Sequence, residues 1–239
     1  DAIQKPKKRF KKRYMALMLL AGVVFTCKDF IFISTWNVQL TVNVETPKGI
    51  RSGSSVRRYE AKFIPDLLPE TASVDYSVFG EAVAVELAHN EYAFVLLSGG
   101  DHLYNAFPRP KHASTHRQAV KYYRSLDVGT KGEVKKGYTI VRFSDLADPK
   151  SVELLYGYQF NINTQNSEFI DNFQMLLGEG FALQSFDLEI TDKPVKYKID
   201  KILPWLKNLN GGYLHGKQTS RDAPLGLQAG AFVRKKNNE

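Results

Sequence analysis

The stretch TWNVQLTVNVETPKGIRSGSSVRRYEAKF, from Thr35 to Phe63, carries the clearest structural signal in the chain. Apolar and polar residues alternate from Val38 to Glu45, which is the period of a strand buried on one face. Pro47–Gly49 predicts a turn, and Ile50–Phe63 predicts a second strand with a Gly-Ser interruption near its beginning. Two strands joined by a short turn form a hairpin, so the sequence predicts antiparallel β structure.

Downstream of this hairpin the sequence predicts a β-rich domain with a few short helices. Further strands are expected at residues 77–87, 92–99, 138–146 and 181–192, and the first four strands are expected to form a meander. Helices are expected at residues 116–126 and 167–177, at 198–209 with an interruption at Pro204, and in a short turn beginning at Asp148-Pro149. The predicted fold class is α+β and β-rich, with an antiparallel sheet or sandwich.

Upstream of the hairpin, a basic run adjoins an apolar run. Residues 1–13 carry seven bases and one acid, which accounts for +6 of the formal net charge of +8. The rest of the chain is nearly neutral, which argues against nucleic-acid binding, because such domains carry their basic surface on the folded part. Bases that adjoin an apolar run are typical of the cytoplasmic flank of a membrane segment.

The apolar run from Tyr14 to Trp36 predicts a single transmembrane helix. Its 23 residues would rise about 33 Å, slightly more than the roughly 30 Å hydrocarbon core of a bilayer. Lys28 and Asp29 interrupt the run, but Lys28 lies about 21 Å along the helix, past the bilayer centre, where its side chain can extend to the interface. Trp36 falls where an interfacial aromatic residue is expected.

Two alternatives to the membrane helix remain open, a cleaved or lipidated signal peptide and a buried core helix. The uninterrupted part Met15–Cys27 has the length of a signal core, but no A-x-A-like cleavage site follows it. The favoured organisation has a basic cytoplasmic tail at 1–13, a transmembrane helix at 14–36, an exported β-rich domain at 37–209 and a glycine-rich extension at 210–239. The bases orient the N-terminus to the cytoplasm, so the domain is expected in the periplasm, anchored to a bacterial inner membrane.

No coherent catalytic motif is found in the sequence, and no catalytic residue, cofactor or metal site is expected. The single cysteine, Cys27, excludes an internal disulfide and a cysteine-based metal cluster. Ser98, Asp101 and His102 form the best local candidate for a hydrolase. They lack the strand–turn–helix context of a nucleophile elbow, because the residues that follow are loop-like.

Two groups of residues are candidate binding contacts. Arg51, Arg57 and Arg58 accompany the Gly-Ser element of RSGSSVRR and predict a contact for an anion, although Gly-Ser in a hairpin is also typical of a bulge or turn. The candidate partner contacts are small, polar or aromatic residues: Ala16, Ala21, Gly22, Lys28, Asp29, Trp36, Trp205 and Tyr213. The alternatives are that Lys28-Asp29 only ends the helix and that Trp205 packs inside the domain.

Six stretches taken together resemble a known group of proteins. They are WNVQLTVNVETPKGIRSGSSV (Trp36–Val56), GEAVAVEL (Gly80–Leu87), YAFVLLSG (Tyr92–Gly99), RFSDLADPKSVELL (Arg142–Leu155), LEITDKPV (Leu188–Val195) and PWLKNLNGGYLHG (Pro204–Gly216). In this order they resemble uncharacterised proteobacterial proteins with an N-terminal membrane segment and an exported β domain. The resemblance covers most of the chain from Trp36, with the poorest match at Pro108–Lys136. It implies a bacterial inner-membrane setting and transfers no catalytic residue.

Three functions are compatible with these features. The favoured one is a non-catalytic accessory subunit of a larger inner-membrane complex of respiratory or photosynthetic type, whose partners are other membrane subunits and the lipid bilayer. The second is a periplasmic binding module for a small anion or an envelope polymer. The third is an enzyme built around Ser98–His102. The single anchor, the closely attached domain and the lack of a coherent active site favour the first.

Overall fold

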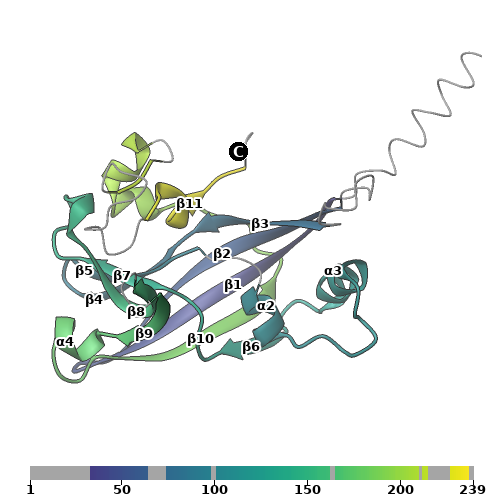
Figure 1. Cartoon of the computed structure of the whole chain (residues 1–239), viewed down its shortest axis with the longest axis horizontal. Helices are drawn as coiled ribbons and strands as arrows, with labels where there is room; N and C mark the ends of the chain where they lie inside the picture. Colours follow the sequence, from purple (N-terminus) through teal and green to yellow (C-terminus); the bar gives the residue numbers. More distant parts are fainter. Residues whose placement is uncertain are drawn as a thin grey trace, which may run out of the picture. The chain divides into compact units, whose positions relative to one another are not determined.

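The computed structural model describes residues 33–63, 74–97, 101–161, 165–209, 212–214 and 227–236. One compact unit consists of Thr35–Glu60 and Tyr76–Glu239, and both sheets of the chain are built from it (Figure 1). A second unit consists of residues 1–34 and 61–75. Within the second unit, the structure describes only residues 33–34, 61–63 and 74–75.

The N-terminal hairpin forms the middle of a six-stranded sheet with the order β11-β3-β2-β1-β10-β6. Val38, Leu40, Val42 and Val44 are all buried on one face of β1, so the predicted half-buried strand is confirmed. The strands are β1 (Ile33–Thr46), β2 (Gly49–Phe63), β3 (Val74–Glu81), β6 (Lys131–Val134), β10 (Ala182–Thr191) and β11 (Val233–Arg234).

A second, five-stranded antiparallel sheet has the order β4-β5-β7-β8-β9. Its strands are β4 (Val83–Ala88), β5 (Glu91–Val95), β7 (Ile140–Phe143), β8 (Val152–Asn161) and β9 (Asn166–Asp171). Only Ala82 separates β3 from β4, so the chain passes from one sheet to the other at this residue. The expected four-strand meander is therefore wrong, because the strand expected at 77–87 is divided between the two sheets.

Helices are short and lie in the connections. They are α2 (Asp101–Ala106), α3 (His116–Ser125), α4 (Phe173–Leu177) and the 3₁₀ turns Pro149–Ser151, Ile199–Lys201, Pro204–Asn208 and Ala229–Ala231. The predicted helix at 116–126 is confirmed, and Thr115 and Gln118 form a reciprocal cap at its beginning. The predicted Asp148 cap is also confirmed, since its carboxylate accepts the Lys150 N–H at 2.8 Å.

The expected helix at 167–177 is wrong over its first half, where the structure has β9. Residues 166–171 pair with β8, and Tyr158 lies directly opposite Phe169 with the two rings 5.2 Å apart. This cross-strand aromatic pair stabilises a strand, and it outweighs a local helical pattern. Only Phe173–Leu177 is helical, and the helix ends at Gly178 as predicted.

Two apolar layers stabilise the unit that consists of Thr35–Glu60 and Tyr76–Glu239. Between the sheets, Phe186 of β10 lies 6.2 Å from Tyr156 of β8 and 4.9 Å from Tyr138, measured between ring centroids. On the other face of the five-stranded sheet, Phe232 lies 5.7 Å from Phe143 and 6.2 Å from Trp205. Residues 227–236 therefore contribute to the core, and they do not belong to a separate extension beginning at residue 210.

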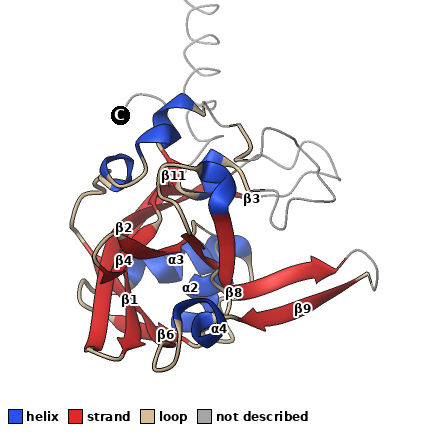
Figure 2. Cartoon of the chain, turned by 90° about the vertical axis from the view of Figure 1, so that its left-hand side faces the viewer, coloured by secondary structure: helices blue, strands red, loops and turns tan. Residues whose placement is uncertain are grey.

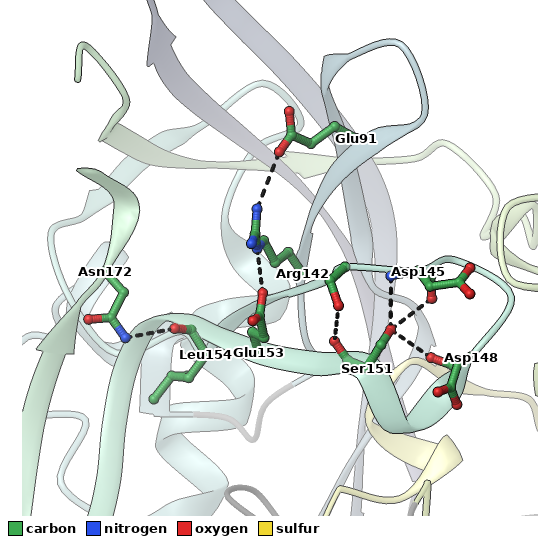
Figure 3. A network of polar contacts seen from close by, with 9 residues as sticks. Glu91, Arg142, Asp145, Asp148, Ser151, Glu153, Leu154 and Asn172 are labelled. Carbon is green, nitrogen blue, oxygen red and sulfur yellow. Dashed lines mark hydrogen bonds and ion pairs between the residues drawn. The ribbon is translucent and has the colours of Figure 1, made fainter. Parts of the chain in front are cut away.

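Arg142 fixes the alignment of three neighbouring strands of the five-stranded sheet (Figure 3). Its Nε atom donates to the Glu153 carboxylate on β8 at 2.7 Å, and its Nη1 atom donates to Glu91 on β5 at 3.3 Å. The turn between β7 and β8 is closed by Ser151, whose hydroxyl donates to the carbonyl oxygens of Asp145 and Asp148. Ser151, Asp145 and Asp148 thus hydrogen-bond to one another within the turn and stabilise its conformation.

The position of Phe232 in the core leads to the first prediction. Phe232→Ala should lower the free energy of unfolding by about 3–5 kcal/mol, because it leaves a cavity among three aromatic rings. Denaturant unfolding of the purified protein measures this change. Val128→Ala is the matched control at an exposed site, and it should change stability by less than about 0.5 kcal/mol. Equal effects of the two substitutions would contradict the packing of the C-terminal segment.

Candidate functional site

The candidate binding site is a pocket of about 190 Å³ on the exposed side of β2. Strand β2, the end of β3 and the extended segment that follows β10 together form its walls. Its lining residues are Ser54, Ser55, Val56, Glu81, Lys193, Pro194, Lys196 and Lys198. Three lysines against one glutamate give the pocket an excess of positive charge.

The Gly-Ser element of β2 forms the strand side of the pocket. A Cβ atom on Gly53 would lie 2.3 Å from the carbonyl oxygen of Ala84, so only glycine lets β2 approach β4 this closely. The Ser55 hydroxyl donates to the carbonyl oxygen of Glu81 at 3.0 Å, which ties β2 to the end of β3. Ser54 is exposed and its hydroxyl is available to a ligand.

Glu81 positions the lysine-bearing wall of the pocket. This carboxylate is 8% exposed, and its Oε2 atom accepts the backbone N–H of Ile199 at 2.8 Å and also that of Lys198. Hydrogen bonds from backbone amides stabilise a carboxylate where it is removed from water. The negative charge of Glu81 is thus used to hold the chain that carries the lysines.

The three lysines extend from that chain segment with exposed side chains. Lys196 and Lys198 are both exposed, and both line the pocket. The Lys193 Nζ atom donates to the Gln39 side chain at 2.9 Å. Among the ion pairs of the described chain, none involves Lys196 or Lys198.

These residues supply three ammonium groups and hydroxyl donors. The one carboxylate of the lining already accepts hydrogen bonds from backbone amides. The pocket therefore suits the binding of an anionic group.

The structure does not bring the three predicted arginines together. Arg57 and Arg58 are adjacent on β2 and face opposite sides of the sheet, because side chains alternate along a strand. Arg57 is buried, whereas Arg51 is exposed near the beginning of the strand. The lysines at 193, 196 and 198 were missed by sequence reasoning. Their spacing in DKPVKYK was visible, but nothing in it indicated that they would lie beside Ser54.

The predicted partner contacts are placed only in part. Ala16, Ala21, Gly22, Lys28 and Asp29 lie outside the described residues. Ile33–Trp36 belong to β1 and so are not part of a helix, and Trp36 is buried between the rings of Tyr59 and Tyr123. Trp205 packs on Phe143 and donates its indole N–H to the carbonyl oxygen of Leu146. This agrees with the alternative that Trp205 packs inside the domain. Tyr213 forms a single bridge with Gln228.

The remaining sequence hypotheses concern the membrane helix and the hydrolase. In the part of the chain that the structure describes, no helix has the length and apolarity needed to cross a bilayer, and residues 14–32 lie outside that part. Ser98 and the side chain of Asp101 also lie outside it. His102 is buried, with its ring 4.0 Å from that of Tyr138.

No protein-family model, no curated protein and no solved structure matches this chain.

The contacts of Glu81 lead to the second prediction. Glu81→Ala should lower the free energy of unfolding by about 1–3 kcal/mol, because two backbone N–H groups lose their acceptor. Equilibrium unfolding in urea measures the loss. Glu45→Ala removes an exposed carboxylate from strand β1 of the same sheet and should change stability by less than about 0.5 kcal/mol. If both variants match the parent protein, Glu81 does not anchor the lysine segment.

Proposed function

We propose that the unit built from the two sheets is a non-catalytic binding module for an anionic group. Phosphate, sulfate or carboxylate groups would be bound by the ammonium groups of Lys193, Lys196 and Lys198 and by the hydroxyl of Ser54. The observation that supports this function is the pocket itself, in which three lysines face one carboxylate that backbone amides already occupy.

The size of the pocket favours a terminal anionic group over a whole small molecule. Pockets that enclose drug-sized ligands measure about 300–1,000 Å³, whereas this one measures about 190 Å³. A water molecule occupies about 30 Å³ in the liquid. The pocket therefore has room for a polyatomic anion and a few attached atoms, and the rest of the ligand would extend into solvent.

The strength of the contacts favours a polymer that carries repeated anionic groups. Ion pairs between exposed groups contribute about 0.2–1 kcal/mol each, so three lysines supply at most about 3 kcal/mol. A dissociation constant of 1 mM requires about 4 kcal/mol. A single free anion would thus bind more weakly than about 1 mM, while a polymer gains effective concentration from its neighbouring groups. We infer an anionic polymer of the bacterial envelope as the ligand class.

Charge removal in the pocket provides the third prediction. Replacing Lys196 and Lys198 with Gln should weaken the binding of fluorescent linear polyphosphate about 2–30-fold, because two charged contacts are lost. Fluorescence anisotropy of the full chain in detergent, at low and physiological salt, measures the affinity. The matched control replaces Lys131 and Lys207, which lie outside the pocket, with the same change in net charge. An equal loss in the control would assign binding to overall charge and contradict the proposal.

A second candidate function is favoured by an exposed aromatic hairpin. Strands β8 and β9 extend away from the other strands (Figure 2), and β9 is an edge strand of its sheet. Tyr158 is 56% exposed and Phe169 is 36% exposed, and their rings contact each other. Exposed aromatic residues on an unpaired edge are typical of protein interfaces. We propose that this hairpin contacts another subunit of a membrane complex of respiratory or photosynthetic type, in which the chain is an accessory subunit.

The membrane setting of this second function rests on the basic and apolar runs at the N-terminus. Because β1 begins at Ile33, the proposed anchor shortens to Tyr14–Phe32. Its 19 residues would rise about 27 Å as a helix, which is within the usual range for a bilayer. Lys28 would then lie about 6 Å from the end of the helix, closer to the interface than the longer helix places it. The N-terminus is proposed to be cytoplasmic and the β-rich unit periplasmic.

The hairpin leads to the fourth prediction. After gentle detergent extraction, the parent protein should migrate in a native gel as part of a larger assembly, and Tyr158→Ser combined with Phe169→Ser should release it, because the exposed rings are lost. The control combines Ile50→Ser with Val128→Ser, which are exposed apolar residues elsewhere, and should leave the assembly intact. A sharp monomer of the parent protein in every mild detergent would count against an accessory subunit.

A further inference from the structure

A guanidinium group is enclosed between the two sheets. Arg57 extends from β2, and only 1% of its surface is exposed. Its Nη2 atom donates to the carbonyl oxygens of Val95 and Leu96, both at 3.1 Å, so the side chain bridges from the six-stranded sheet to the end of β5. Its Nε and Nη1 atoms are buried and have no hydrogen-bond partner in the described structure.

Aromatic groups surround this guanidinium. The Arg57 Cζ atom lies 5.3 Å from the centroid of the Tyr138 ring, and Tyr59 lies two residues along β2 on the same buried face. The Tyr138 hydroxyl is itself buried and makes no hydrogen bond of standard geometry with a described residue, although the Tyr59 side chain interacts with it. Nε and Nη1 of Arg57 and the hydroxyl of Tyr138 thus lie in the same part of the interior.

No described group supplies a negative charge to Arg57. Glu81 is the one buried carboxylate among the described side chains, and its acceptor atom is taken by the backbone N–H groups of Lys198 and Ile199. Burial raises the pKa of Tyr138 well above its ordinary value, and it also raises the pKa of Tyr59. Both phenols therefore keep their protons at neutral pH and act as hydrogen-bond donors.

The contacts of Arg57 satisfy only part of its guanidinium group. Removal from water is costly for a charged group unless its donors are paired, and the two backbone carbonyl oxygens satisfy only the Nη2 atom. The contact with the Tyr138 ring is a further favourable but weak interaction. An internal water molecule would supply hydrogen bonds but no charge. A small anion would supply both.

We propose that Arg57 and Tyr138 form an internal binding site for a compact monovalent anion, of which chloride is the natural example. The anion accepts hydrogen bonds from the Nε and Nη1 atoms of Arg57 and from the Tyr138 hydroxyl. Since Arg57 bridges the two sheets, the bound anion stabilises their contact. This site is distinct from the lysine pocket, because Arg57 faces the interior and the lysines are exposed to solvent.

The test measures thermal unfolding of the full chain at constant ionic strength while gluconate is replaced by bromide. The expected result is a saturable rise of the unfolding midpoint, together with an anomalous bromide peak beside Arg57 in crystals. Tyr138→Phe deletes one donor and should weaken the bromide response about 5–10-fold. Tyr123→Phe, which alters another buried phenol, should leave the response unchanged. The variant that combines Lys196→Gln with Lys198→Gln should also keep the bromide response, which separates this site from the lysine pocket.

Three results would overturn the internal site. The first is a parent protein with neither a saturable bromide response nor a bromide peak. The second is an unchanged response in Tyr138→Phe with the bromide peak located away from Arg57. The third is an Arg57→Met variant that folds and retains the full response. If Arg57→Met does not fold, the Tyr138→Phe titration and the bromide peak still decide the matter.

Discussion

The carboxylate of Glu81 joins parts of the chain that are distant in sequence. It accepts the backbone N–H groups of Lys198 and Ile199 at the residue that ends β3. The next residue, Ala82, carries the chain into the second sheet and donates its N–H to the carbonyl oxygen of Phe232 at 2.7 Å. The lysine segment is thus attached at Glu81, and the C-terminal core segment is attached at the next residue, Ala82. A buried carboxylate is costly unless it is hydrogen-bonded, so the two backbone donors stabilise Glu81 in this position.

Local chemistry in the sequence predicted the elements that depend on neighbouring residues. The alternation from Val38 to Val44 gave β1 because one face of that strand is apolar throughout. Asp148 identified one helix beginning, since its side chain caps a backbone N–H group within the same turn. The division at Ala82 and the strand β9 were not predicted. Both depend on pairing with residues far along the chain, and the local pattern of apolar and polar residues does not encode such pairing.

The sequence indicated the Gly-Ser element of the candidate site but not the cations that lie beside it. The element RSGSSVRR does line a cationic pocket, through Ser54 and Ser55. The alternation of side chains along β2 places Arg57 in the interior, so the arginines do not form one surface. The cations of the pocket come from Lys193, Lys196 and Lys198, which follow β10. Their proximity to β2 results from sheet order and from the anchor at Glu81, and neither is visible in sequence spacing.

The pairing of β1 with β10 has a kinetic consequence. Val42 lies opposite Phe186 in the six-stranded sheet, and Phe94 contacts Phe232 in the core. Formation of each contact therefore requires a long loop of chain to close. Contacts between residues far apart in sequence form slowly, because loop closure precedes any gain from packing. Until Phe232 has emerged from the ribosome, the apolar face formed by Phe94 and Phe143 lacks the cover that Phe232 supplies. This part of the core is therefore completed only after synthesis has passed that residue.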